Sequence, residues 1–375
     1  MTTGLPFIPV GEPEIADADR RRVLECLDSG WLSGEGPHVA EFEQALASRV
    51  ARQHGIAVAS GSSALDCAFA ALNLIPGDEV IMPAFTIISC AAAVVRAGGV
   101  PVTVDCDPFT WTMAPHEVAD RIGPRTHAIL IVHIYGLPAD ADPILDLARA
   151  RGLWVVEDAA EVIGQTYRGR PCGGMGDLSV FSFFANKNIT TGEGGMVLTN
   201  DAALAEKCRK LRNLCFEPGR RFVHEELGWN WRMSNLQAAL GCGQLERLDD
   251  IVQRKRAIGR AYQDRLAGLP QLQLPVDATA FAHNDYWVFG VVLNDSVPFG
   301  AEEAIKRLAA NGIGTRPFFW PLHEQPALRK LGFGHNVKHP HAERLARRGF
   351  YLPSSLTLSE AAIDRVCDNV RALVA

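Results

Sequence analysis

Short apolar runs alternate with amphipathic stretches between about residues 56 and 200. The runs carry hydrophobic residues at consecutive positions, which indicates strands buried on both faces, whereas the stretches between them repeat their apolar positions with a helical period. Buried strands separated by helices form a largely parallel sheet covered on both sides. Strands are predicted at residues 56–59, 79–82, 101–105, 128–134, 153–157, 179–184 and 195–199, and helices at 64–72, 88–97 and 143–151.

The pattern changes after residue 200, where strands become fewer. A long helix is predicted at 235–266, with Gly268 and Pro270 just beyond it as stop signals. These features predict an α/β chain with a large sheet domain at residues 1–244 and a smaller α/β domain at 245–375. The Gly- and Pro-rich segment 7–36 is predicted to be a loop of the large domain that reaches a site. The other predicted elements are helices at 202–212, 302–311, 340–348 and 359–374, and strands at 286–293 and 314–318.

Composition limits what the chain can bind. The 375 residues are 47% hydrophobic and 21% charged, which is ordinary for a globular protein of two domains. A net charge of −6 offers no basic field to a nucleic acid, and no apolar run reaches the ~20 residues that span a membrane. The nine cysteines stand singly, without Cys/His spacing typical of zinc. We therefore expect reduced thiols, a cytoplasmic location and no metal site.

Four segments each supply one part of a site for a phosphorylated, cationic, ring-shaped ligand. In the first, a strand ends in Gly61-Ser62-Ser63 and a helix begins. A helix N-terminus presents unpaired backbone N–H groups and the positive end of the helix dipole, which together bind anions. The alternative is an ordinary serine N-cap.

The second segment is a buried strand that ends in Glu157-Asp158. A carboxylate there costs several kcal/mol to desolvate unless a cation meets it. Asp158 is therefore a candidate partner for a protonated ring nitrogen, which makes such a ring an electron sink. A helix cap or a surface salt bridge is the alternative.

In the third segment, an aromatic strand delivers Lys187 into a loop rich in Thr and Gly. Apolar surroundings destabilise an ammonium, so the free amine becomes accessible and can form a Schiff base with an aldehyde. A solvated loop lysine is the alternative. The fourth segment places Asn230 and Arg232 between tryptophans, which suits a polar contact at a dry interface or a loop before the long helix.

These segments resemble a known family. GSSAL, VVEDAAE, FSFFANKNITTGEGGMV and GWNWRMSNLQAAL are similar to segments of the DegT/DnrJ/EryC1/StrS sugar aminotransferases, and the similarity runs from residue 30 to residue 360. The resemblance implies the fold of type I pyridoxal-phosphate (PLP) enzymes, which is aspartate-aminotransferase-like, with PLP as cofactor. It also implies a homodimer with active sites at the subunit interface.

The resemblance assigns roles to individual residues. Lys187 binds PLP covalently, Asp158 pairs with the pyridinium nitrogen, and Glu161 contacts the ring hydroxyl. The residues implied to bind the phosphate are Gly61, Ser62, Ser182 and, from the partner subunit, Asn230. Related enzymes that dehydrate sugars have a histidine in place of the lysine, so Lys187 favours transamination.

The implied reaction moves an amino group from L-glutamate to the C4 ketone of a nucleotide-linked 4-keto-6-deoxy sugar, with GDP-4-dehydro-6-deoxy-D-mannose as the expected substrate. Arg316 could clamp a carboxylate or a diphosphate, or form a structural ion pair. Trp31 is a loop contact or a plain hydrophobic anchor. The candidate substrate contacts are Trp31, Ser33, Arg316, Phe318 and His323.

One position departs from the family pattern. Ile87 stands where the family usually has an aromatic residue that stacks on the pyridine ring. Either an aliphatic side chain covers the ring, or Phe85 does so from a shifted position. The loss of stacking weakens cofactor binding by about 1 kcal/mol and removes no chemical step.

Three other functions compete with this interpretation. A member of the same family could act at C3, or on a dTDP- or UDP-linked sugar. An NAD-dependent reductase is disfavoured because no G-x-G-x-x-G follows the first strand. A non-catalytic regulator that binds PLP or a sugar nucleotide is disfavoured because Lys187 and Asp158 are both present.

Overall fold

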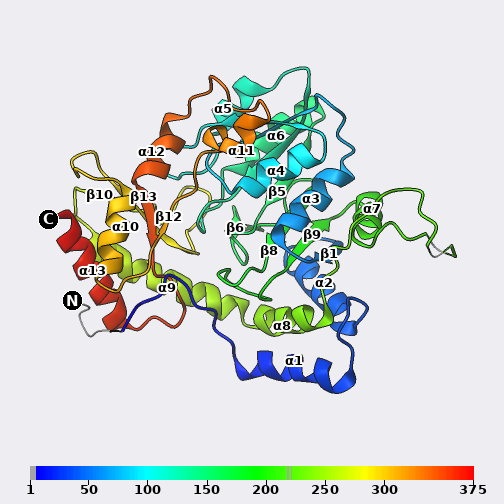
Figure 1. The fold of residues 1–375 in the computed structure, drawn as a ribbon, viewed down its shortest axis with the longest axis horizontal. Helices are drawn as coiled ribbons and strands as arrows, with labels where there is room; N and C mark the ends of the chain where they lie inside the picture. Colours follow the sequence, from blue (N-terminus) through cyan, green and yellow to red (C-terminus); the bar gives the residue numbers. More distant parts are fainter. Residues whose placement is uncertain (1–5, 218, 221) are drawn as a thin grey trace.

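Two sheets, of seven and four strands, form the framework of the chain (Figure 1). The computed structural model describes residues 6–217, 219–220 and 222–375, so residues 1–5, 218 and 221 of the predicted large domain lie outside the description. The larger sheet has seven strands in the order β1-β9-β8-β5-β4-β2-β3. Their bounds are β1 (His54–Val58), β2 (Glu79–Pro83), β3 (Val100–Val104), β4 (Thr126–Val132), β5 (Trp154–Asp158), β8 (Leu178–Ser182) and β9 (Gly195–Thr199).

Strand directions follow from the connections. β9 is antiparallel to both of its neighbours, and the other strands of this sheet are parallel to one another. The link from β8 to β9 contains no helix, and a short link of this kind returns the chain in the opposite direction. The predicted fold, a large and mostly parallel sheet of the type I PLP enzymes, is confirmed.

Helices cover both faces of the large sheet (Figure 1). Consecutive residues along a strand enter different cores, as Val155 and Val156 of β5 do, so the strands are apolar at adjacent positions. The helices within and around this domain are α2 (Pro37–Arg49), α3 (Gly61–Ala71), α4 (Ile88–Arg96), α5 (Pro115–Arg121), α6 (Ala141–Arg151), α7 (Ala202–Arg212) and α8 (Asn235–Glu246). A small two-stranded sheet pairs β6 (Thr166–Tyr167) with β7 (Arg170–Pro171).

The second sheet is antiparallel and has the order β10-β11-β13-β12. The N-terminal segment packs into the core of this sheet, because Ile8 forms an isolated parallel bridge with Ile313 and both are buried there. Across the described residues, no helix combines the length and apolar composition that crossing a bilayer requires. The elements here are β10 (Leu272–Gln273), β11 (Phe289–Leu293), β12 (Arg316–Pro317), β13 (Gly349–Leu352), α9 (Leu248–Leu266), α10 (Ala301–Ala310), η1 (Leu322–Glu324), α11 (Pro326–Lys330), α12 (Pro340–Arg348) and α13 (Glu360–Val374).

Two predicted elements were wrong. The segment 7–36 is not all loop, because α1 (Asp17–Ser29) occupies its middle. This helix packs along α8 and is highly charged, with Asp19 and Cys26 as its buried residues, so its apolar periodicity is weak. The predicted helix at 235–266 is two helices that meet at Arg247, whose guanidinium is bonded to Asp19. The predicted domain boundary at 244 falls in the last turn of α8.

Candidate active site

A cavity of about 310 Å³ opens where several parallel strands end. Asp158 at the end of β5, Ser182 at the end of β8 and Gly61 at the start of α3 line it. Arg316 and Tyr351 line it from the second sheet, so the cavity lies between the two sheets. The carboxyl edge of a parallel sheet is where ligands bind in open α/β folds.

The N-terminus of α3 forms one end of the cavity. The amides of Gly61 and Ser62 lie in the first helical turn, where no intrahelical acceptor exists. A Cβ on Gly61 would lie 2.6 Å from the Cβ of Ser182, so only glycine allows this approach. The Ser62 hydroxyl is 2.9 Å from that of Ser89 in α4. Backbone amides and hydroxyls therefore surround a space suited to a phosphate.

Asp158 presents a buried carboxylate to the same cavity, and 4% of its surface is exposed. The backbone amide of Ala160 donates to Oδ1 at 3.0 Å, and the thiol of Cys90 donates to Oδ2 at 3.5 Å. Burial raises the pKa of Asp158 above its ordinary value, while the nearby cation Lys187 opposes that rise. A protonated ring nitrogen would provide the further cation that favours the ionised form.

Lys187 lies in the loop between β8 and β9 and is largely buried. Its Nζ is 3.6 Å from Oε1 of Glu161 and 3.7 Å from the centre of the Trp287 ring. Burial lowers the pKa of Lys187. Burial also raises the pKa of Glu161 to about 7, and its Oε2 accepts a hydrogen bond from the amide of Tyr135 at 2.8 Å. Burial thus favours the free amine, which is the form that attacks an aldehyde.

The residues present fit PLP at each of its reactive or charged groups. The N-terminus of α3 suits the phosphate, Asp158 suits the ring nitrogen, and Lys187 suits the aldehyde. The predicted residues that the structure brings together in this cavity are Gly61, Ser62, Asp158, Glu161, Ser182, Lys187 and Arg316.

The remaining predicted contacts lie elsewhere in this chain. Trp31, Ser33 and Asn230 are exposed side chains outside the cavity lining. Phe318 is buried in an aromatic cluster, and its neighbour Phe319 lines the cavity instead. His323 lines a separate cavity of about 150 Å³, and its Nε2 is 3.1 Å from Oε1 of Glu343.

The position of Ile87 bears on the ring-stacking question. Ile87 is 46% exposed and lines the cavity. Phe85 is fully buried against Phe318 and Phe319 and is absent from the lining. The structure thus presents an aliphatic side chain, and not Phe85, to the ligand space.

Sequence reasoning missed several lining residues. Tyr135 has a left-handed backbone, with φ of 53°. This conformation is uncommon for a bulky residue, and residues that adopt it are found often at functional sites. No sequence pattern signals that conformation. Among the missed side chains are Ser89, Tyr135, Trp287, Phe319 and Tyr351.

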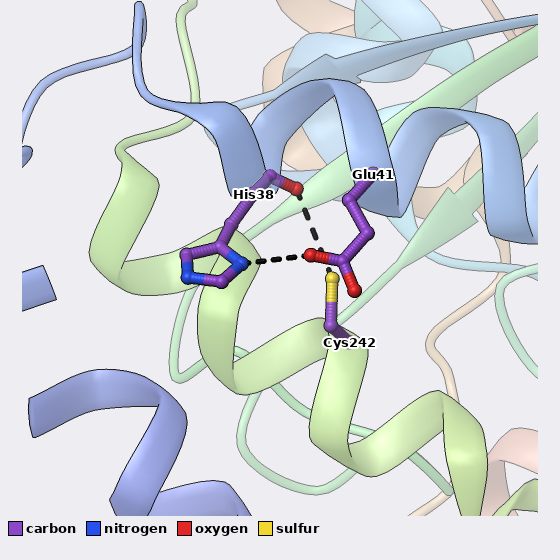
Figure 2. A group of neighbouring side chains, drawn as sticks. All are labelled: His38, Glu41 and Cys242. Carbon is purple, nitrogen blue, oxygen red and sulfur yellow. Dashed lines mark hydrogen bonds and ion pairs between the residues drawn. The ribbon is translucent and has the colours of Figure 1, made fainter. Parts of the chain in front are cut away.

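A group of His38, Glu41 and Cys242 joins α2 to α8 away from the cavity (Figure 2). His38 Nδ1 is 2.8 Å from Oε2 of Glu41, and Arg22 donates to the other oxygen at 2.9 Å. Burial raises the pKa of the Cys242 thiol to about 12, and this thiol donates to the His38 carbonyl. Each side chain already has a protein partner, so we assign the group to helix packing.

Comparisons with known proteins agree with this geometry. The profile of the DegT/DnrJ/EryC1/StrS aminotransferase family matches residues 13–371. The GDP-perosamine synthase of Caulobacter vibrioides is 42% identical over 363 residues, covering 96% of this chain and 97% of that protein. The UDP-N-acetyl-3-dehydro-alpha-D-glucosamine 3-aminotransferase of Acidithiobacillus ferrooxidans is 38% identical, covering 92% and 90%. The PLP-form of a putative sugar aminotransferase from Streptococcus pneumoniae superposes with a TM-score of 0.91 at 25% identity, covering 98% of both chains.

Proposed function

The chain belongs to the DegT/DnrJ/EryC1/StrS aminotransferase family and is a PLP-dependent sugar aminotransferase, and from this premise we propose that it makes GDP-perosamine. The amino donor is L-glutamate, and the acceptor is the C4 ketone of GDP-4-dehydro-6-deoxy-D-mannose. The support for this acceptor is the 42% identity to a GDP-perosamine synthase over almost the entire length of both chains. The observation that carries the chemistry is the buried amine of Lys187 beside Asp158 and Glu161 in one cavity.

Each proposed role follows from the chemistry of the residue. Gly61, Ser62 and Ser182 bind the phosphate, Asp158 keeps the ring nitrogen protonated, and Glu161 faces the ring hydroxyl. Bound PLP supplies a covalent carbonyl for amines and an electron sink that stabilises negative charge on carbon. The protein's part is to hold this group still and to keep its charges paired.

Lys187 moves protons in both halves of the reaction. Its free amine removes a proton from Cα of the donor and delivers one to C4′ of the cofactor, and the second half reverses these transfers on the sugar carbon. Burial lowers the pKa of Lys187, which makes its free amine more accessible as a base.

The acceptor has to reach the cavity from its open side. Arg316 lines the mouth and is exposed, so it is placed to pair with the donor carboxylate or with a diphosphate. Ile87 and Phe184 line the same cavity and are 46% and 42% exposed. We propose that a second copy of the chain covers these apolar side chains and brings Asn230, Trp31 and Ser33 to the site. We also propose a cytoplasmic location, in line with nine free cysteines.

Borohydride reduction tests the central role. Reduction of the PLP-loaded protein should add a stable pyridoxyl mass to the peptide that contains Lys187, and Lys187→Ala should lose both the label and turnover. Lys255 is an internal control, because it is also buried but lies outside the 310 Å³ cavity. An unlabelled Lys187, or a label on Lys255 alone, would overturn the proposal.

A second candidate acts at C3 or on a UDP- or dTDP-linked sugar. The observation that supports this candidate is the 38% identity to a 3-aminotransferase that acts on a UDP-linked sugar. Product analysis with GDP-, UDP- and dTDP-linked keto sugars separates the two. Amination at C4 of the GDP sugar with the highest kcat/KM supports the first proposal. Preference for a 3-keto sugar, or for a UDP- or dTDP-linked sugar, supports the second.

A further inference from the structure

Trp287 lies directly against the amine of Lys187 and has no role in the proposed chemistry so far. The Lys187 Nζ is 3.7 Å from the ring centre, and Trp287 is 4% exposed. A cation over the face of an indole is attracted by the ring quadrupole, and this attraction grows when water is excluded. The contact therefore favours one position of the amine and favours its protonated form.

The chain on both sides of Lys187 is bonded to the turn that carries Trp287. The indole Nε1 of Trp287 donates to the carbonyl oxygen of Asn186 at 2.7 Å. The side-chain amide of Asn188 donates to Oδ2 of Asp285 at 3.1 Å, and Oδ1 of Asp285 accepts from the backbone amide of Trp287 at 3.1 Å. The residues before and after the lysine are thus held by the same turn.

The turn itself has little freedom to move. Asp285 is fully buried, and its amide donates to the carbonyl of Gly136 at 3.1 Å. A Cβ on Gly136 would lie 2.2 Å from Oδ1 of Asp285, so the two segments approach as closely as glycine permits. The next residue, Tyr286, has a left-handed φ of 53°. The turn leads into β11, so the lysine loop is tied to the second sheet.

We propose that Trp287 is a positioning residue, whose indole face holds the amine of Lys187 at the base of the cavity whenever that amine is not bonded to the cofactor. The hydrogen bonds of Asp285 with Asn188 and with the amide of Trp287 fix the indole relative to the lysine loop. The inference rests on the proposed role of Lys187. The proton transfers of both half-reactions need the amine at one fixed place, and this contact supplies it.

Other charged groups also act on the amine. Glu161, Asp158 and Cys90 raise the pKa of Lys187, while burial lowers it more strongly. Arg316 and Tyr351 line the same cavity. Since these groups stay in place when Trp287 changes, the contribution of the ring can be measured separately.

The test measures how the acetylation rate of the Lys187 amine depends on pH, and it does not require turnover. The cofactor-free full chain is acetylated across a range of pH, and the rate at Lys187 is compared by mass spectrometry with that at exposed Lys330. For Trp287→Leu we expect the half-maximal pH at Lys187 to fall by about one unit, because the ammonium loses its aromatic partner. Trp287→Phe keeps a weaker aromatic face and should shift less.

The direction of the midpoint shift separates this effect from simple opening of the site. Easier access of water relieves the burial that lowers the pKa of Lys187 and would raise the midpoint, whereas loss of the aromatic partner lowers it. A raised midpoint in Trp287→Leu would therefore overturn the proposal. Trp154→Leu is the matched control, since Trp154 lies at the opposite end of β5 from Asp158. Should Trp287→Leu fail to fold, Trp287→Phe carries the measurement. Equal midpoints in the parent and in every folded Trp287 variant would overturn the proposal.

A second readout uses the loaded enzyme. Trp287→Leu should lower kcat about tenfold with little change in KM for L-glutamate, because binding groups remain and proton transfer loses its alignment. An unchanged kcat with a raised KM would count against positioning. Borohydride labelling of Lys187 in the parent decides the proposed function independently, so the two proposals can fail separately.

Discussion

Replacing Asp158 by Asn tests two opposite effects of its buried charge. The charge lowers folding stability in the cofactor-free protein, and it supports turnover in the PLP-loaded protein. Asp158 is 4% exposed, and burial raises its pKa above the ordinary 3.8, so the carboxylate is less stable in the folded chain than in the unfolded chain. Folding stability therefore falls as pH rises through the window above 3.8. Asn keeps an oxygen that can accept from Ala160 and carries no charge. The cofactor-free variant should thus melt at a higher temperature than the parent at neutral pH.

The PLP-loaded variant should behave in the opposite way. Two opposite unit charges ~4 Å apart interact by about 4 kcal/mol at an effective dielectric constant of about 20. Little of this is screened at Asp158, because the carboxylate is nearly dry. If the ion pair between Asp158 and the ring nitrogen stabilises the transition state by this amount, its loss lowers turnover about 10³-fold. PLP should also raise the melting temperature of the variant by less than that of the parent.

The assay is a thermal melt with and without PLP, together with single-turnover absorbance changes on adding L-glutamate. Asp105→Asn is the matched control, because Asp105 is also buried and also accepts backbone amides, at the start of α12 and outside the cavity. That control should keep its turnover. A turnover within tenfold of the parent in Asp158→Asn would show that this carboxylate does not support a charged ring nitrogen.

Three further changes test other parts of the site. Gly61→Ala should weaken PLP binding at least tenfold in a fluorescence titration, because its Cβ would lie 2.6 Å from that of Ser182, and an unchanged dissociation constant would show that this close approach is not part of the phosphate site. Burial raises the pKa of Glu161 from 4.5 to about 7, so the folded chain loses stability as pH rises through that window. Glu161→Gln should therefore raise the melting temperature of the cofactor-free protein more at about pH 8 than at about pH 5, and equal shifts would contradict this sign. Ile87→Tyr should tighten PLP binding by about 1 kcal/mol, or roughly fivefold, through ring stacking, and an unchanged dissociation constant would place Ile87 away from the ring.

The site residues that follow the strands could be placed from the sequence, because one physical rule governs where parallel strands end. In a parallel sheet the carboxyl ends of the strands share an edge, so Gly61, Asp158 and Lys187 could be placed near one another from their order in the sequence. Buried strands also give an unmistakable pattern, since Val155 and Val156 face different cores and are both apolar. The sheet and this half of the site therefore follow from local sequence.

The other half depends on contacts between distant segments. Trp287 is bonded to Asn186 across 101 positions, and no local pattern indicates that pairing. The break at Arg247 is equally hidden, because the contact that its guanidinium makes there, with Asp19, spans 228 positions of the sequence. Phe318 and Phe319 are adjacent and both aromatic, and only the packing of the second sheet decides which one lines the cavity.

The bridge between Ile8 and Ile313 has a consequence for synthesis on the ribosome. All seven strands of the large sheet lie between His54 and Thr199, so that sheet can form while the last third of the chain is still being made. Ile8 must wait for Ile313, which at ~5–20 residues per second is a delay of about 15–60 s. During this delay a hydrophobic N-terminal segment has no partner. A bulky tag placed there would compete with the late packing of Ile8 against Ile313 in the core of the smaller domain.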